Sequence, residues 1–307
     1  MKQRRPTTLA ALRRRIDRID DSIHALLIRR TRVVEEVRIV KKNERVKIRP
    51  GREADILYRL AQRHRGPFPK RELLRIWREI IVATLAFESS FSVAVFAPHG
   101  QGGIWDATRD QYGSFTPIVR HDSGLGVIRS VAAHHASIGV LPLPVPDDED
   151  AWWPELMDRR ETVYIIARLP FVSAGNARGQ SAGALVIAPA MPDASMRDRA
   201  CLGLETDGRT GREAVLRAFA RARLGRPELI CAEDKARVLW LADLPGRIAP
   251  DDARLTTLVR AFDGACARAV VLGAYAEPFT AADFAAEAGA KKKKAGPKKT
   301  PDKRQRP

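Results

Sequence analysis

Apolar residues recur at spacings of three and four from Leu9 to Val37, and this pattern predicts one long amphipathic helix. Thr7 and Thr8 can cap its N-terminus, and no Gly or Pro interrupts it before about Asn43. At about 1.5 Å per residue the helix is about 50 Å long, too long for the rest of the first 90 residues to cover. We therefore expect a second copy of the chain to cover the stripe, which consists of Leu9, Leu12, Ile16, Ile19, Ile23, Leu26, Val34 and Val37.

Cations interrupt this apolar stripe. Arg30 and Lys41 stand where the spacing calls for apolar residues, about three turns apart, so both point the same way, and Arg13 lies beside Leu12 and Ile16. One interpretation is that their stems cover apolar surface while their charged ends reach water. The other is that they receive an anion, because like charges in an apolar seam are costly without one. The repeated placement favours a polyanionic ligand inside a helix bundle.

The hydrophobic pattern changes twice further along the chain. Helices predicted from near residue 51 to 66 and from 70 to about 90 complete an all-α unit of three helices. From Phe91, strands alternate with helices, as in a small α/β unit with a parallel sheet. From Arg199 the order is β-α-β-β-α-β, which is ferredoxin-like. We predict a multidomain chain with boundaries at 1–90, 91–196, 197–286 and 287–307.

Charge is distributed unevenly among these units. The net charge is +17, and the first 90 residues hold 24 Lys and Arg against 11 Asp and Glu. Residues 291–307 hold nine against one and have no apolar residues able to form a core, so we expect residues 287–307 to be a disordered basic tail. That tail could bind nucleic acid or acidic partners, or act only as a solubilising end.

The remaining chemistry-bearing residues form no recognisable site. The three cysteines have no metal or redox spacing, and no run of 18 apolar residues occurs, so we expect a cytoplasmic protein with no membrane segment. His99, His134 and His135 lack metal-ligand spacing, and we expect them to face solvent. The glycines of residues 100–103 could approach a phosphate, but the rest of a dinucleotide fingerprint is missing.

Five motifs follow one another along residues 9–88. They are Leu12-Arg13-x-x-Ile16-Asp17, Leu26-Leu27-x-x-Arg30, Val37-x-x-x-Lys41, Arg52-Glu53 and Trp77-Arg78-Glu79-Ile80-Ile81. In this order they resemble the motifs of the all-helical chorismate mutases. The resemblance implies an intertwined homodimer in which the long first helices pair. It also implies rearrangement of chorismate to prephenate in aromatic amino acid biosynthesis, with no cofactor and no metal.

The same resemblance implies roles for individual residues. Arg30 would clamp a substrate carboxylate, Lys41 would donate to the ether oxygen, and Arg13 would reach a carboxylate from the other subunit. Glu53 would accept from the ring hydroxyl. The set of substrate-binding positions is completed by Arg52, which adds positive charge, Thr84, which lies near a carboxylate, and Glu88.

Two positions depart from the family pattern. Arg49 stands where many relatives have Asp, in the connector before the second helix. Glu88 is a catalytic position that holds Gln in some members and Glu in others. A Gln can donate to the ether oxygen at any pH, whereas a Glu donates only when protonated. We hypothesise that the apolar bundle raises the pKa of Glu88, or that activity is better at acidic pH.

Residues 91–280 resemble a shortened prephenate dehydratase followed by an ACT-type regulatory domain, but the motifs have changed. The dehydratase turn reads Ala97-Pro98-His99-Gly100-Gln101, residues 142–146 replace Pro-x-Glu-Asn-Ser, and the Thr-Arg-Phe motif falls on Ala182-Gly183-Ala184. We predict no dehydratase activity. Both phenylalanine signatures are also lost, so we expect a structural or dimerising appendage.

Two alternatives to a mutase stay open at this point. A basic helical dimer could bind nucleic acid, with its cations on the outer helix faces and no need for Glu53. A mutase-like subunit without activity could regulate another shikimate-pathway enzyme, which the residues at positions 49 and 88 leave possible.

Overall fold

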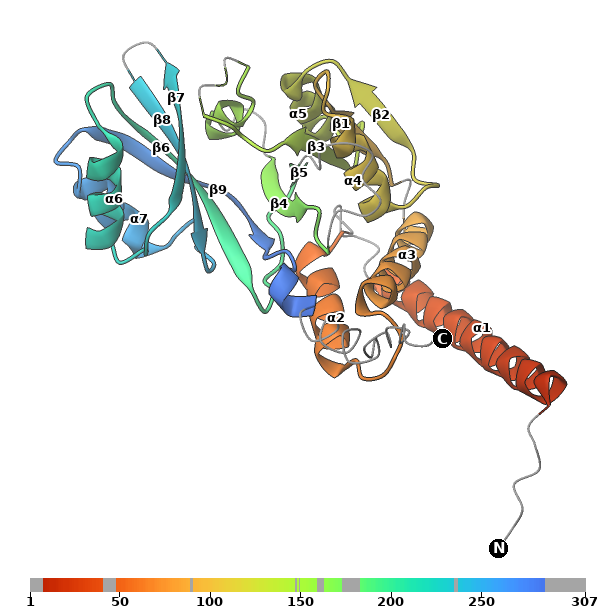
Figure 1. Ribbon diagram of the computed structural model, residues 1–307. Coiled ribbons are helices and arrows are strands. Elements are labelled where there is room, and N and C mark those ends of the chain that lie inside the picture. Colours follow the sequence, from red (N-terminus) through yellow and green to blue (C-terminus); the bar gives the residue numbers. More distant parts are fainter. Residues whose placement is uncertain are drawn as a thin grey trace, which may run out of the picture.

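The computed structural model of the 307-residue chain describes eight stretches of it: residues 8–40, 48–88, 91–146, 148, 150–158, 163–172, 183–234 and 237–284. Figure 1 shows a helical domain, a small α/β unit above it and a larger twisted sheet backed by two helices. Lys41 and the predicted basic tail lie outside the described residues.

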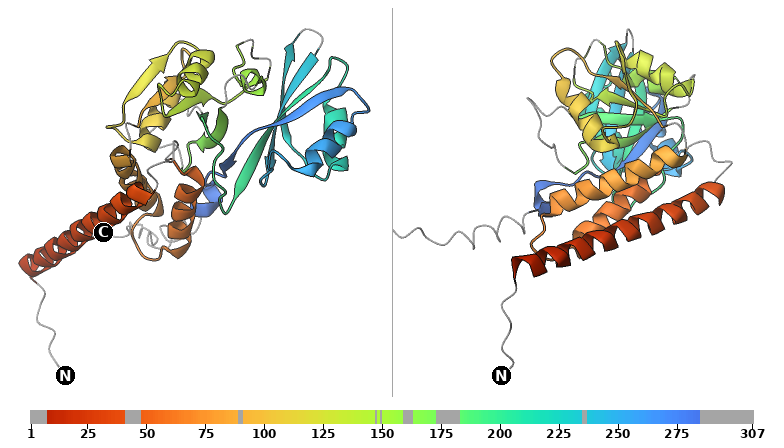
Figure 2. Two further views of the ribbon diagram at one scale, coloured as in Figure 1. Left: turned by 180° about the vertical axis from the view of Figure 1, so that it is seen from behind. Right: turned by 90° about the vertical axis from the view of Figure 1, so that its right-hand side faces the viewer.

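Three helices form the N-terminal domain, as predicted: α1 (Leu9–Val40), α2 (Pro50–Arg63) and α3 (Lys70–Glu88). None of the 32 residues of α1 is buried, and the helix contacts α3 along one side only (Figure 2). By contrast, α2 and α3 bury Leu57, Tyr58 and Leu74 between themselves and the C-terminal part of the chain. The apolar stripe of α1 is therefore uncovered within one chain.

The described strands form one nine-stranded sheet in the order β2-β1-β3-β5-β4-β9-β6-β8-β7. In the α/β unit, β1 pairs in parallel with β2 and β3, whereas β5 runs antiparallel to both β3 and β4. Only β5 departs from the predicted parallel sheet, since β4 is antiparallel to β5 and therefore runs in the same direction as β1 and β3. An antiparallel pair such as β3 and β5 needs no helical crossover between its members. The elements are β1 (Val93–Phe96), α4 (Gly102–Tyr112), β2 (Ile118–His121), α5 (Gly124–Ala132), β3 (Ile138–Pro142), η1 (Trp153–Met157), β4 (Tyr164–Leu169) and β5 (Ala184–Ala188).

The C-terminal unit has the predicted β-α-β-β-α-β order, with strands β9-β6-β8-β7 adjacent in the sheet. Helices α6 and α7 bury Phe219 and Leu258 against one face, and Trp153 and Met157 pack against the other. Its elements are β6 (Asp198–Asp207), α6 (Arg212–Arg221), β7 (Glu228–Asp234), β8 (Arg237–Pro245), α7 (Ala253–Arg260), β9 (Cys266–Ala276) and η2 (Ala281–Phe284).

The two sheet units meet where β4 lies beside β9. Gly273 of β9 pairs with Ile165 of β4, and a Cβ at residue 273 would lie 2.1 Å from the Ile165 carbonyl oxygen. Its φ of 150° is also one that other residues rarely adopt. Only glycine therefore allows this close approach, which makes one continuous sheet of two units expected to be separate.

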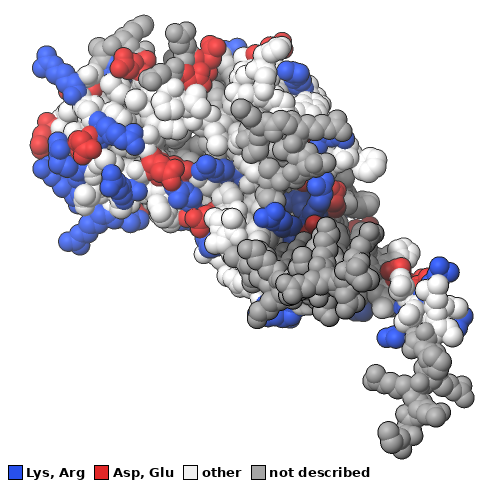
Figure 3. All heavy atoms as spheres, in the orientation of Figure 1, with Lys and Arg blue, Asp and Glu red and all other residues white. Residues whose placement is uncertain are grey.

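The described surface differs in charge from one region to another. In Figure 3, Lys and Arg gather over α6 and α7, where Arg217, Arg221, Arg254 and Arg260 are exposed. No helix among the described residues is long and apolar enough to cross a membrane.

Candidate active site in the helical domain

Arg30 and Thr84, which lie 54 positions apart in the sequence, come together where α1 crosses α3. The half-buried Arg30 guanidinium donates to the Ile80 carbonyl and to Thr84 Oγ1, at 3.5 Å each. The buried Thr84 hydroxyl donates to the Ile81 carbonyl at 2.7 Å, which leaves its oxygen facing the guanidinium. Arg30 therefore points inward, against α3, as the apolar spacing of α1 predicts.

Arg52 adds a second positive charge near Arg30. Burial and the charge of Arg52 both lower the pKa of Arg30. No carboxylate among the described residues forms an ion pair with Arg30. A half-buried cation beside a second positive charge is favoured when an anion lies next to it. The arrangement is therefore suited to a ligand with carboxylate groups.

Glu53 has a different environment from that expected for a ligand contact alone. It is buried in the first turn of α2, and Oε2 forms an ion pair of 2.5 Å with the buried Arg78 of α3. Burial raises the pKa of Glu53, and the positive charge of Arg78 opposes that shift. The protein thus engages this carboxylate through Arg78 and through the Arg49 backbone, and a bound molecule could use only the acceptor capacity that remains.

The ion pair between Arg78 and Glu53 was not predicted from the sequence, although Arg78 belongs to one of the five motifs. A signal was present, because Leu74, Arg78, Ile81 and Leu85 share the 3–4 spacing of the apolar face of α3. A cation on such a face needs a buried acceptor, just as Arg30 does on α1.

The other predicted site residues are not brought to this group within one chain. Arg13 is exposed on α1, and 17 positions of helix place it about 25 Å from Arg30. Lys41 lies just beyond the last described residue of α1. Glu88 ends α3, but its side chain lies outside the described residues. Their roles stay predictions.

The sheet units contain a separate cavity and the altered dehydratase motifs. His99 and Gly100 lie in the turn after β1, and Pro142 ends the neighbouring parallel strand β3. A cavity of about 470 Å³ lies further along the sheet, between β3, β5 and the C-terminal unit. One of the carboxylates that line it, Asp243, is already paired with Arg199 at 2.8 Å and with Arg168 at 3.7 Å. None of the predicted mutase residues lines this cavity.

Metal and redox sites are not found among the described residues. No group of three His, Cys, Asp or Glu side chains could hold a metal ion there. His99, His134 and His135 are exposed, as predicted. Cys201, Cys231 and Cys266 are free thiols.

Comparison with known families identifies the helical domain. Residues 12–89 match the family model of chorismate mutase type II. The N-terminal domain is a chorismate mutase type II domain. The matched residues include Arg13, Arg30, Lys41, Arg52 and Glu53, as well as Thr84 and Glu88 at the end of α3.

Curated relatives extend the similarity beyond this mutase domain but cover only part of the chain. The bifunctional chorismate mutase/prephenate dehydratase of Pseudomonas aeruginosa is 34% identical over 144 residues, which are 44% of this chain and 38% of that protein. The protein of the same name from Stutzerimonas stutzeri is 33% identical over 142 residues, again 44% and 38%. The chain thus matches less than half the length of these relatives.

Solved structures resemble the sheet region only loosely. A prephenate dehydratase from Streptococcus mutans covers 62% of this chain and all of its own length, at 11% identity and a TM-score of 0.41. A quorum-quenching acylase covers 61% of this chain and 95% of its own, at 16% identity and the same score. Scores this low support no conclusion about what the sheet region does.

Proposed function

We propose that the chain is a chorismate mutase that converts chorismate to prephenate by electrostatic and conformational catalysis. The observation that supports this most is the contact of Arg30 with Thr84 where α1 crosses α3, with the positive charge of Arg52 of α2 nearby and no described carboxylate paired with Arg30. Chorismate is a dicarboxylate, so its charge complements this group.

The rearrangement needs no covalent intermediate with the protein. The substrate must be held in a folded near-attack shape, and donors must meet the negative charge that develops on the ether oxygen. In our proposal Arg30 binds a carboxylate with Thr84 alongside, and Glu53 accepts from the ring hydroxyl through its remaining acceptor capacity. Lys41 and Glu88 would donate to the ether oxygen, and no cofactor takes part.

A homodimer is part of this proposal. The exposed apolar stripe of α1 includes Leu12, Ile16, Ile19, Ile23 and Leu26, which are 41–59% exposed. A second α1 would bury the stripe and bring Arg13 of its own chain toward the site, a distance that Arg13 cannot cover within one chain. The dimer thus accounts for both the uncovered stripe and the separation of Arg13 from Arg30.

We further propose that the sheet region has no dehydratase activity. The positions of its expected motifs hold Gln101 in the first turn and Gly183 and Ala184 at the start of β5. The hydroxyl and guanidinium groups that the resemblance implies for catalysis are thus replaced. A cytoplasmic location stays a prediction from the sequence.

The decisive experiment follows chorismate consumption and prephenate formation by the purified chain, with prephenate decarboxylation products measured in parallel. Arg30→Ala should lower kcat/KM by about 10²- to 10³-fold, because it removes a charged donor from a largely dry site. Arg29→Ala is the matched control, since it removes the same charge from an exposed neighbour on α1.

Three outcomes separate the candidate functions. Equal activities in the two variants would contradict the proposed site. A dimeric chain with no turnover at all would favour the inactive, mutase-like interaction subunit. Phenylpyruvate as a product would contradict the loss of dehydratase activity.

A further inference from the structure

The first turn of α2 contains two predicted substrate-binding residues, Arg52 and Glu53, yet it has no cap of its own. The first N–H groups of a helix lack partners within the helix, and the side chain of the N-cap residue usually accepts from the second or third of them. Here the N-cap is Arg49, whose side chain makes no capping hydrogen bond, and Pro50 follows it. A guanidinium has only donors, so Arg49 cannot do what Asp, Asn or Ser would do at that position.

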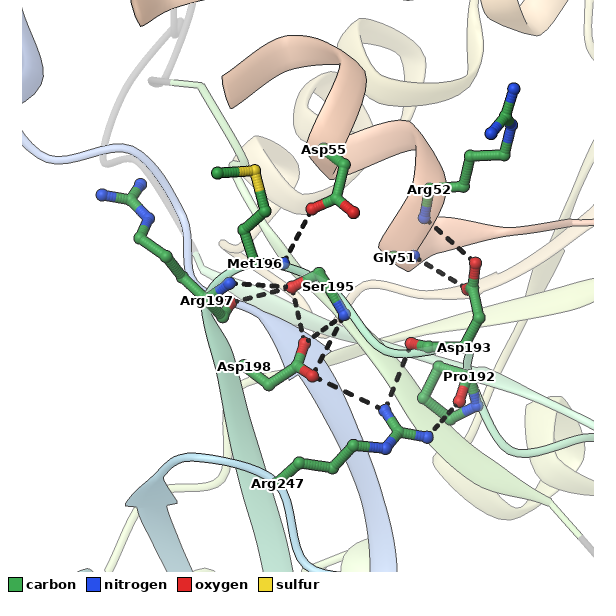
Figure 4. Close-up of polar contacts among 10 residues, drawn as sticks. All are labelled: Gly51, Arg52, Asp55, Pro192, Asp193, Ser195, Met196, Arg197, Asp198 and Arg247. Carbon is green, nitrogen blue, oxygen red and sulfur yellow. Dashed lines mark hydrogen bonds and ion pairs between the residues drawn. The ribbon is translucent and has the colours of Figure 1, made fainter. Parts of the chain in front are cut away.

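Asp193 supplies the missing cap from a distant part of the chain (Figure 4). It lies between β5 and β6, and its Oδ1 accepts from the Gly51 N–H at 3.0 Å while Oδ2 accepts from the Arg52 N–H at 3.1 Å. These are the second and third positions of α2, the N–H groups that an N-cap side chain normally serves. The negative charge also lies at the positive end of the helix dipole.

The segment that contains Asp193 is itself held in place from the C-terminal unit. Arg247, which follows β8, donates to the Asp193 carbonyl at 3.2 Å and to the Pro192 carbonyl. Asp198, at the start of β6, accepts from the Ser195 N–H at 3.1 Å. The sheet region therefore helps to position the cap.

The contact is close on the helix side as well. A Cβ at residue 51 would lie 2.6 Å from the carbonyl oxygens of both Asp193 and Ala194, so only glycine fits there. One turn further along α2, Asp55 accepts from the Met196 N–H at 2.7 Å. In Figure 4 the Arg52 side chain points away from Asp193 while its N–H faces it, so the cap fixes the backbone and leaves the guanidinium available.

We propose that Asp193 is a positioning residue of the mutase site, and that the sheet region acts in catalysis by capping α2. This inference rests on the proposed mutase function. Arg52 and Glu53 stand in the turn whose amides Asp193 holds, and loss of a cap lets a first turn fray. Because a displacement of about 1 Å at a positioned group can cost up to about a hundredfold in rate, the cap contributes to activity without touching substrate.

The test compares three variants of the full chain in steady-state chorismate kinetics. Asp193→Ala should raise KM for chorismate about fivefold to tenfold with a smaller effect on kcat, since substrate-binding residues lose their placement. Asp193→Asn should raise KM less than Asp193→Ala, because the single amide oxygen can accept from only one of the two N–H groups that the carboxylate oxygens serve. Asp55→Asn is the matched control: it weakens a hydrogen bond between the same two segments but leaves the first turn capped.

A fourth variant tests whether loss of the cap causes the rise in KM. Adding Arg49→Asn to Asp193→Ala places a capping side chain at the N-cap of α2 itself, and it should restore most of the lost affinity. Gly51→Ala disturbs the same contact from the helix side and should raise KM like Asp193→Ala. A wild-type KM in Asp193→Ala would overturn the inference while the proposed function stands.

Amide hydrogen exchange gives a readout that does not depend on turnover. Peptides covering residues 50–56 should exchange faster in Asp193→Ala than in wild type or Asp55→Asn. If wild type has no mutase activity, the proposed function fails, and exchange still reports on the cap. Unchanged exchange in Asp193→Ala would overturn the capping role itself.

Discussion

The helical domain and the C-terminal sheet unit bury their apolar residues in opposite ways. In the sheet unit, Phe219, Val215 and Leu258 are fully buried by residues of the same chain. In α1, 32 residues form a regular amphipathic helix of which none is buried. One chain is thus enough to bury the core of the sheet unit, whereas the apolar stripe of α1 stays exposed within one chain.

The two regions therefore differ in which parts of the molecule support them. The core of the C-terminal unit is filled by residues of the same chain. In our proposals the helical domain depends on a second α1 on one side and, through Asp193, on the sheet region on the other. The candidate site would then rely on parts of the molecule outside its own three helices.

The largest expected effect comes from placing a charge in the middle of the exposed α1 stripe. Ile23→Glu should abolish dimer formation and lower mutase activity below detection, because each subunit of a symmetric interface would bury an unpaired carboxylate at a cost of several kcal/mol. Sedimentation and chorismate turnover measure the two effects. Val119→Glu is the control, since Val119 of β2 is 55% exposed, against 52% for Ile23.

A dimeric, active Ile23→Glu variant would show that α1 does not form the interface. The wild-type melting temperature of the helical domain should also rise with protein concentration, as expected when folding and association are linked.

The α1 stripe also illustrates what sequence can and cannot predict. Local patterns such as the spacing of Leu12, Ile16 and Ile19 fixed the helix, and the placement of Arg30 on that stripe correctly indicated an inward-facing cation. Pairings between distant segments left no such local trace. Two examples are the contact of Gly273 with Ile165 and the contact of Asp193 with the N-terminus of α2. Both depend on how complete units pack, and no nearby sequence pattern predicts either partner.

The second effect tests the self-contained side of the comparison. Phe219→Ala should destabilise the C-terminal unit by about 3–5 kcal/mol, the usual cost of deleting a fully buried aromatic side chain. Urea unfolding monitored by the fluorescence of Trp240, which lies in the same core, measures it. The loss should be the same at low and high protein concentration, because no second chain contributes to this core. A concentration-dependent midpoint would contradict the contrast with α1.

The smallest effect concerns a charge cluster on the sheet surface. Glu205 of β6 accepts from Arg237 at 2.7 Å and from Arg268 at 2.9 Å. Burial raises the pKa of Glu205, but the hydrogen bonds and charges of the two arginines outweigh it, so the net pKa lies below its ordinary value. A carboxyl whose pKa is lower in the folded state stabilises the fold above the unfolded pKa of about 4.3, and this contribution is lost as pH falls through the folded pKa.

Glu205→Gln should therefore cost about 1 kcal/mol or less at neutral pH, since Arg237 is half exposed and solvent screens the pair. The difference from wild type should shrink as pH falls below about 4, where the wild-type carboxyl is also neutral. Urea midpoints across this range measure it, and Glu228→Gln, whose side chain is 74% exposed, should show almost no change at any pH. Because the cluster lies within one chain, the cost should not vary with protein concentration, and a cost that did would mean that the sheet unit also depends on a partner.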